Sequence, residues 1–112
     1  MKPKILIGEM ARLHNISTQT LRYYDQIGLL KPQYIDEENN YRYYSVDQFA
    51  LLDSILLLKE LGMSLQQIQN YFDDRNTESM MELLQVKQRK IEKEIRLLKQ
   101  KNKSISNKRS FI

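Results

Sequence analysis

The sequence lacks cysteine altogether and contains a single histidine, His14. Without thiolates there is no disulfide, no cysteine nucleophile, no thiolate zinc site and no iron–sulfur cluster. One histidine excludes a metal site built on two imidazoles and disfavours a Ser–His–Asp triad. The three glycines form no phosphate-binding loop. We therefore expect no enzyme, no catalytic residue, no cofactor and no metal.

The 112 residues also contain no apolar run of eighteen, which excludes a membrane-spanning helix. The first ten residues have no apolar core followed by a small-residue cleavage site, so they do not form a signal peptide. The length fits one domain, or a small domain with an appendage, and is too short for a TIM barrel or a protein kinase. The absence of cysteine permits a reducing compartment, and we expect a cytoplasmic protein.

Positive charge is concentrated in the C-terminal third of the chain. Residues 1–75 carry eight Lys/Arg and ten Asp/Glu, a net charge of −2, whereas residues 76–112 carry ten Lys/Arg and four Glu, a net charge of +6. A basic helical face is more often solvated surface than a binding site, so charge alone does not locate a nucleic-acid partner.

Serine and glycine mark the ends of the predicted helices. Ser17, Ser45 and Ser64 each precede a helical stretch, where a serine hydroxyl can accept a hydrogen bond from a free backbone N–H of the first turn. Gly28 and Gly62 close two of these stretches, because glycine adopts positive φ at little cost. Ser45 and Ser64 are each followed three residues later by glutamine, which is the spacing of a capping box.

The first thirty residues predict a helix-turn-helix. We expect short helices over residues 8–14 and 18–27, with a tight turn at 15–17. Residues 5–7 could form either a short strand or simply a lead-in to the first helix.

A β-hairpin is predicted to follow. Residues 33–35 and 41–44 are rich in β-forming side chains and flank a polar loop. Because this loop has no glycine, Asn39 and Asn40 must supply any residue with positive φ.

Two further helices are predicted, over residues 46–60 and 65–72. The first is apolar most of the way round, so it must be covered on more than one side. A domain of about 75 residues can hardly cover it alone, and we infer contact with another element or another chain.

Heptads of apolar residues from about residue 77 to 106 predict a long coiled-coil helix, with two polar a positions. Such a helix would be about 45 Å long, and no folded part of this chain is large enough to bury its apolar stripe. We expect it to pair with a copy of itself; the alternatives are a lone solvated helix or one folded back on the domain. The predicted dimer seam consists of Met81, Leu84, Ile91, Ile95, Leu98 and Ile105.

Helix, tight turn, helix and hairpin in this order are typical of a winged helix-turn-helix, whose second helix enters the DNA major groove. Gln19 can read an adenine edge with two hydrogen bonds. Thr18 and Thr20 can bond phosphates or bases, and Arg22 carries a planar fork that suits phosphate or guanine.

Aromatic side chains next to these residues have two interpretations. Tyr23 and Tyr24 can offer hydroxyls to phosphates, but they point about 100° apart, so one of them could equally pack in the core. Arg42 lies among the hairpin tyrosines, where a wing arginine can touch the DNA backbone or minor groove. The alternative is that it stacks on Tyr43 or Tyr44 and does nothing else.

Several ordered motifs between residue 5 and about residue 74 closely resemble the DNA-binding domain of the MerR family of bacterial transcription regulators, most of all its multidrug-responsive activators. The motifs are Ile7-Gly8-Glu9, Leu21-Arg22-Tyr23-Tyr24-Asp25, Gly28-Leu29-Leu30, Tyr41-Arg42-Tyr43-Tyr44 and Leu61-Gly62-Met63-Ser64-Leu65. The resemblance implies a mainly α fold: a winged helix-turn-helix, a second helix pair and an antiparallel coiled coil between subunits. It also implies a pseudo-palindromic promoter whose overlong spacer is bent and untwisted so that RNA polymerase can engage it.

Residue by residue, the resemblance implies that Arg22 contacts DNA, that Tyr23 and Tyr24 contact phosphates, and that Arg42 is the wing arginine. Lys59 matches a family lysine that grips phosphate near the operator centre; the alternative is a charge that only complements its helix dipole. The complete predicted DNA-binding set is Ser17, Thr18, Gln19, Thr20, Arg22, Tyr23, Tyr24, Tyr41, Arg42 and Lys59.

We divide the chain into a DNA-binding domain, residues 1–75, and a coiled-coil dimerisation helix with its tail, residues 76–112. Metal- and redox-sensing members of the family use cysteines beyond the dimer helix, so those inducers are excluded for this chain. Drug-sensing members carry a further ligand domain, so the chain is either a shortened form or a member without a sensor. A coiled-coil protein-interaction module without DNA binding is the alternative function.

Overall fold

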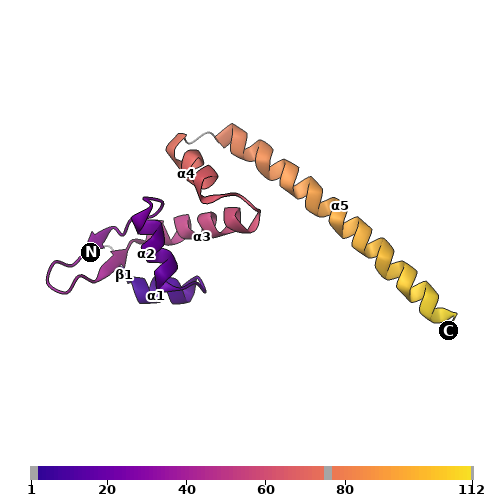
Figure 1. The fold of residues 1–112 in the computed structure, drawn as a ribbon, viewed down its shortest axis with the longest axis horizontal. Helices are drawn as coiled ribbons and strands as arrows, with labels where there is room; N and C mark the ends of the chain where they lie inside the picture. The colour runs from indigo at the N-terminus through magenta and orange to yellow at the C-terminus, as the bar shows by residue number, and fades with distance from the viewer. Residues whose placement is uncertain (1–2, 75–76, 112) are drawn as a thin grey trace. The chain divides into compact units, whose positions relative to one another are not determined.

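The computed structural model describes residues 3–74 and 77–111 and is mainly helical, as predicted. Its elements follow the order β1, α1, α2, β2, β3, α3, α4, α5 (Figure 1). The chain forms two compact units, Met1–Asn70 and Tyr71–Ile112. The boundary predicted between residues 75 and 76 falls on residues outside the described ranges.

The helix-turn-helix is formed by α1 (Ile7–Leu13) and α2 (Thr18–Gln26). Asn15 in the turn has φ 56°, a left-handed conformation that asparagine tolerates better than most residues. Ser17 caps α2, since its Oγ accepts a 3.1 Å hydrogen bond from a backbone N–H of the first turn. Gly28, with φ 78°, follows the end of α2 as predicted.

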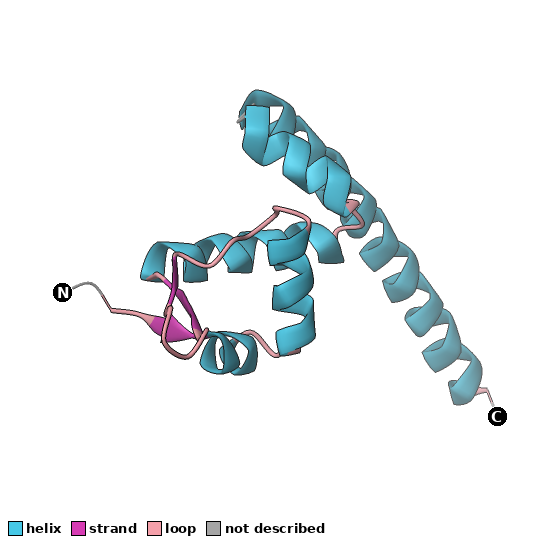
Figure 2. Cartoon of the chain, turned by 60° about the vertical axis from the view of Figure 1, so that its left-hand side comes forward, coloured by secondary structure: helices cyan, strands magenta, loops and turns pink. Residues whose placement is uncertain are grey.

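The hairpin is confirmed and gains a third strand. β2 (Tyr34–Ile35) and β1 (Ile5–Leu6) both pair antiparallel with β3 (Arg42–Tyr44), so the sheet order is β1-β3-β2. Figure 2 shows the strands in magenta among the cyan helices. The open question about residues 5–7 is thus answered by a two-residue strand that runs directly into α1. In the hairpin loop Asn40 supplies the positive φ, at 60°.

The second helix pair is α3 (Val46–Glu60) and α4 (Leu65–Asp74). Both predicted capping boxes form: the Ser45 and Ser64 hydroxyls accept from the N–H groups three residues on, and both glutamine side chains accept from the serine N–H. Gly62, at φ 90°, ends α3. Helix α4 ends two residues later than the predicted range of 65–72.

The core of the first unit draws on α1, α2, β3, α3 and α4, whereas both residues of β2 are exposed. Helix α3 turns Leu52, Ile55 and Leu58 inward, but Leu57 stays 52% exposed, so the described residues of the first unit do not cover this apolar helix all the way round. The largest fully buried side chains are Met10, Leu21, Tyr44, Leu52, Ile55 and Ile68.

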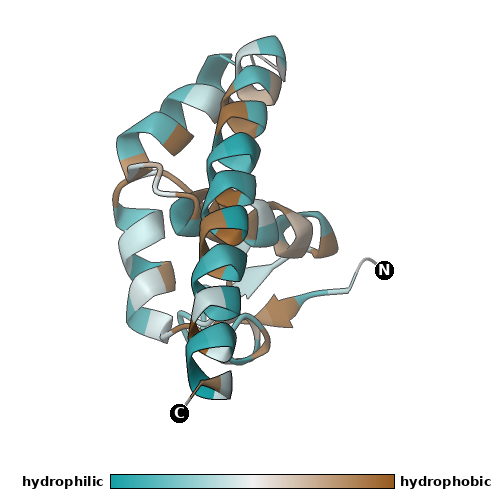
Figure 3. Cartoon of the chain, turned by 90° about the vertical axis from the view of Figure 1, so that its right-hand side faces the viewer, coloured by the Kyte–Doolittle hydropathy of each residue, from teal (hydrophilic) through white to brown (hydrophobic). Residues whose placement is uncertain are grey.

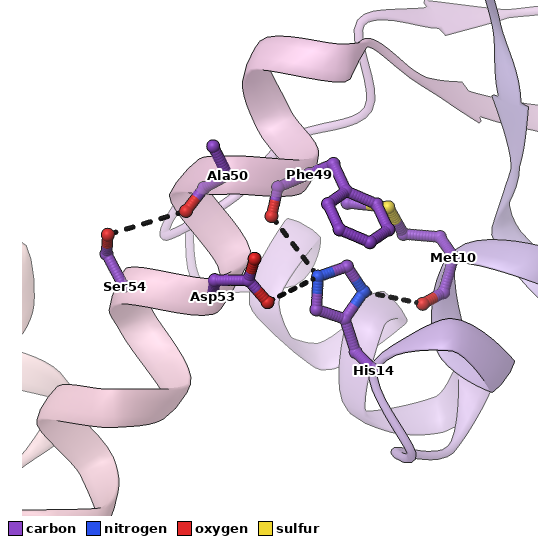
Figure 4. Close-up of polar contacts among 6 residues, drawn as sticks. All are labelled: Met10, His14, Phe49, Ala50, Asp53 and Ser54. Atoms are coloured by element: carbon purple, nitrogen blue, oxygen red, sulfur yellow. Dashed lines mark hydrogen bonds and ion pairs between the residues drawn. The ribbon is translucent and has the colours of Figure 1, made fainter.

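His14 ties the helix-turn-helix to α3 (Figure 4). Its Nδ1 lies 2.8 Å from the Met10 backbone oxygen, and its Nε2 lies 3.2 Å from the Phe49 backbone oxygen and 3.1 Å from Asp53 Oδ1. The imidazole also packs against the Phe49 ring, with 4.1 Å between centroids. The lone histidine is therefore a structural link between the helix-turn-helix and α3.

Helix α5 (Thr77–Ser110) continues four residues past the predicted end and, at 34 residues, is about 51 Å long. Apolar bands recur along it between hydrophilic ones (Figure 3). Leu84 is half-buried, whereas the later seam positions Ile91, Ile95, Leu98 and Ile105 are all exposed. Within the described ranges, no helix has the length and apolar character needed to cross a membrane.

Candidate nucleic-acid interface

The start of α2 presents the polar side chains predicted for base and phosphate contact. Leu21 and Tyr24 face the core, so the other side of this amphipathic helix is left for solvent. Gln19 is exposed there. The hydroxyls of Ser17 and Thr20 lie 2.9 Å apart and bond each other, which fixes the first turn in one geometry.

The two adjacent tyrosines of α2 have different environments. Tyr23 is 49% exposed, whereas Tyr24 is only 4% exposed, and burial raises the pKa of the Tyr24 hydroxyl. Their ring centroids are 6.4 Å apart. Tyr24 is therefore the tyrosine that packs in the core, and its predicted phosphate contact, which no observation tests, depends on the hydroxyl alone.

The wing arginine turns toward α2. Arg42 Nε lies 3.5 Å from Asp25 Oδ2, and the same carboxylate lies 3.7 Å from Lys31 Nζ. The cation–π contact found among the described residues joins Lys4 to Tyr34 and does not involve Arg42. Asp25 was not among the predicted site residues. Its sequence signals are its place in the motif Leu21-Arg22-Tyr23-Tyr24-Asp25 and its position three residues after Arg22, one helical turn along the same face.

Tyr44 lies beneath this charged group. Its side chain is fully buried, and no hydrogen bond to its hydroxyl is found within the described residues. Burial is the main reason that the pKa of Tyr44 rises to about 12; the Asp25 carboxylate raises it further, while Arg42 and Arg22 lower it. The three charged side chains are therefore close enough to act on one buried hydroxyl.

A shallow cavity of about 170 Å³ opens between α2 and the wing. It brings together three of the predicted DNA-binding residues, Arg22, Tyr41 and Arg42. A Cβ built on Gly8 would meet nothing within 4 Å, so the backbone does not crowd this side of the cavity. The residues that line it are Leu6, Ile7, Gly8, Arg22, Asn40, Tyr41 and Arg42.

Lys59 does not belong to this cavity. It is exposed in the last turn of α3, and its backbone oxygen accepts a 3.0 Å hydrogen bond from the Gly62 N–H. A cation at the C-terminal end of a helix complements the helix dipole, and this holds for Lys59 whether or not it also contacts DNA. In the described parts of the chain, no group of three or more His, Cys, Asp or Glu side chains could hold a metal ion.

Comparison with known proteins gives consistent matches. Residues 5–75 match the family described as MerR HTH family regulatory protein. The chain is 39% identical over 100 residues to the multidrug-efflux transporter 2 regulator of Bacillus subtilis, a match that covers 89% of this chain and 36% of the relative. It is 36% identical over the same length to the multidrug-efflux transporter 1 regulator of that species. The chain thus spans about a third of the length of these curated relatives.

A solved structure has the same architecture. HiNmlR, a MerR family regulator lacking the sensor domain and crystallised bound to promoter DNA, superposes with a TM-score of 0.71 at 26% identity, over 97% of this chain and 90% of its own. The predicted winged helix-turn-helix fold and the predicted family are confirmed, and this is a family of regulators rather than of enzymes. The chain belongs to the MerR HTH family of regulatory proteins.

Proposed function

We propose that this chain is a dimeric, sequence-specific DNA-binding transcription regulator that binds and distorts a pseudo-palindromic promoter. The observation that carries the proposal is the common surface made by the polar start of α2, Arg22 and the wing residues Tyr41 and Arg42. A helix that carries one arginine and is flanked by another from a second element suits a groove lined by phosphates. The relative HiNmlR, crystallised on promoter DNA, supports the same function.

Residues 1–75 form the DNA-binding part of the proposal. The first turn of α2, with Thr18, Gln19 and Thr20, meets base edges in the major groove, and this is where sequence preference resides. Arg22 and Arg42 hold the backbone and set the register of the helix in the groove. RNA polymerase is an indirect partner, reached through the shared promoter, and the protein acts in the cytoplasm.

Residues 76–112 form the dimerisation part. Apolar residues of α5 recur every seven positions from Leu84 to Ile105, and the later ones are exposed, which favours a two-stranded coiled coil between two copies of this chain. The antiparallel direction follows from the family resemblance. A two-fold dimer suits a pseudo-palindromic operator, because each subunit then reads one half-site.

Distortion is assigned to Lys59 and Tyr24, which in a two-fold dimer pull on phosphates near the operator centre. Bending and untwisting some twenty base pairs costs on the order of 1–6 kcal/mol, and that energy must come from contacts made only with distorted DNA. Lys59 suits this role because it is exposed at the end of α3.

Binding of the chain to duplex DNA at several salt concentrations tests the function. Phosphate contacts release counterions, so the logarithm of the association constant should fall steeply and linearly with the logarithm of the salt concentration. A protein-interaction module without DNA binding would give no salt-dependent affinity, and that result would refute the proposal.

A further inference from the structure

Two arginines from separate elements meet at one small cavity. Arg22 comes from the middle of α2 and Arg42 from β3, yet both line the same space of about 170 Å³. A water molecule takes up about 30 Å³ in the liquid, so a space of this size can admit a phosphate group. Arg22 forms no ion pair or hydrogen bond with any side chain of the described ranges, and its guanidinium is left available.

Arg42 is already held from one side. Asp25 Oδ2 lies 3.5 Å from its Nε, and that Nε is buried without a hydrogen bond in the described part of the chain. A guanidinium has five N–H donors, so an interaction at Nε leaves the two terminal nitrogens free to hold an anion. Asp25 is itself only 20% exposed, which limits the positions that the pair can adopt.

The charge of the group matches one phosphodiester. Two guanidinium groups and one carboxylate sum to +1, and a backbone phosphate carries −1. All three side chains lie near enough to the Tyr44 hydroxyl to affect its pKa, which agrees with their sharing one neighbourhood. Lys31 also approaches Asp25, at 3.7 Å, but it is exposed and does not line the cavity.

We propose that Arg22 and Arg42 grip one and the same DNA backbone phosphate, and that Asp25 is the positioning residue that sets Arg42 for this contact. The proposal rests on the proposed function. It adds that the recognition helix and the wing act as one anion site instead of two separate contacts.

Salt dependence of DNA binding counts the phosphates that are neutralised. Each phosphate contributes about 0.9 to the slope of log K against log salt. If the arginines share a phosphate, Arg22→Ala and Arg42→Ala each lower the slope by well under 0.9 per subunit, because the other arginine remains, and the double variant lowers it by about 0.9. Two separate phosphates would give about 0.9 for each single variant and about 1.8 for the double, which would overturn the shared site.

The double variant Arg22→Ala with Lys59→Ala is the matched reference for the double arginine variant. Because Lys59 lies outside the cavity, its change in salt slope should add to that of Arg22→Ala. A wild-type chain without a steep salt slope would refute the proposed function itself. A steep wild-type slope with additive arginine variants would refute only the shared site.

Asp25→Asn tests positioning. The substitution removes a negative charge, and that loss by itself strengthens binding to the DNA polyanion. Glu37→Gln in the exposed hairpin loop removes the same charge elsewhere and serves as the control. We expect Asp25→Asn to weaken binding about threefold to tenfold relative to Glu37→Gln, and to have no such effect when Arg42→Gln is already present. Asp25→Glu should restore part of the affinity. Equal losses with and without Arg42, or tighter binding by Asp25→Asn than by the control, would show that Asp25 does not position the arginine.

Discussion

Replacing both Ile91 and Leu98 with lysine should convert the proposed dimer into a monomer. The two side chains are 43% and 63% exposed on α5 of the single chain. Complete burial of such a side chain is worth about 1.5–3 kcal/mol, so pairing would add about 1 kcal/mol for each of them. In a two-fold dimer the double variant therefore removes about 4 kcal/mol of apolar burial.

That loss alone weakens association about a thousandfold. The variant also places four ammonium groups against an apolar seam, which raises the cost further. Six seam residues on each of two helices supply roughly 12 kcal/mol in total, against an association cost of about 4–15 kcal/mol, so the dimer cannot absorb the change.

Sedimentation equilibrium over a range of protein concentrations measures the outcome. Val86→Lys with Leu97→Lys is the matched control, because these residues are 57% and 47% exposed on the same helix but lie off the seam. We expect the control to remain dimeric and the seam variant to sediment as a monomer with unchanged helical content. A seam variant as dimeric as the control would refute the coiled-coil assignment.

Three further predictions concern distortion and stability. Lys59→Ala should weaken DNA binding and relax the bend, measured by fluorescence transfer between the ends of a labelled operator at equal bound fraction; a complex as bent as the wild type would leave Lys59 a helix-dipole charge only. The pKa of Tyr44 is raised from its unfolded value of 10.0 to about 12, because the folded state disfavours the charged phenolate. The stability that this shift gives the folded state is therefore complete below pH 10 and is lost as the pH rises from 10 to 12. The free energy of unfolding should fall by about 2–3 kcal/mol more over that window in the wild type than in Tyr44→Phe, and parallel curves would contradict the shift. His14→Phe should lower the free energy of unfolding by about 1–3 kcal/mol in denaturant titrations, because the acceptors on Met10 and Phe49 lose their donor; an unchanged midpoint would show that the link carries no stability.

The helix boundaries were predictable because short-range chemistry sets them. Ser17, Ser45 and Ser64 each sit at the start of a helix with the expected side-chain hydrogen bonds, and Gly28 and Gly62 take positive φ beyond the ends. These interactions involve residues within four positions of one another, so the sequence alone specifies them.

The unpredicted features all depend on partners distant in the chain. The two residues of β1 carry too short a pattern to decide between a strand and a lead-in, and it is the pairing of Ile5 with Tyr44 that makes them a strand. The same holds for the approach of Asp25 to Arg42, which joins α2 to the sheet across seventeen positions. The burial of Tyr24 was predicted only in part. Helical periodicity indicated that either Tyr23 or Tyr24 could be buried, and the packing of the folded chain decides that it is Tyr24.

Selection of bound DNA from a random duplex pool tests the central claim most directly, because the pool contains every candidate operator. A dimeric regulator with one recognition helix per subunit should enrich sequences in which two inverted half-sites are separated by a fixed spacer. Arg22→Ala should enrich the same half-sites with lower yield if Arg22 holds only phosphate. Recovery of no common sequence, or of a single motif without an inverted copy, would contradict the account.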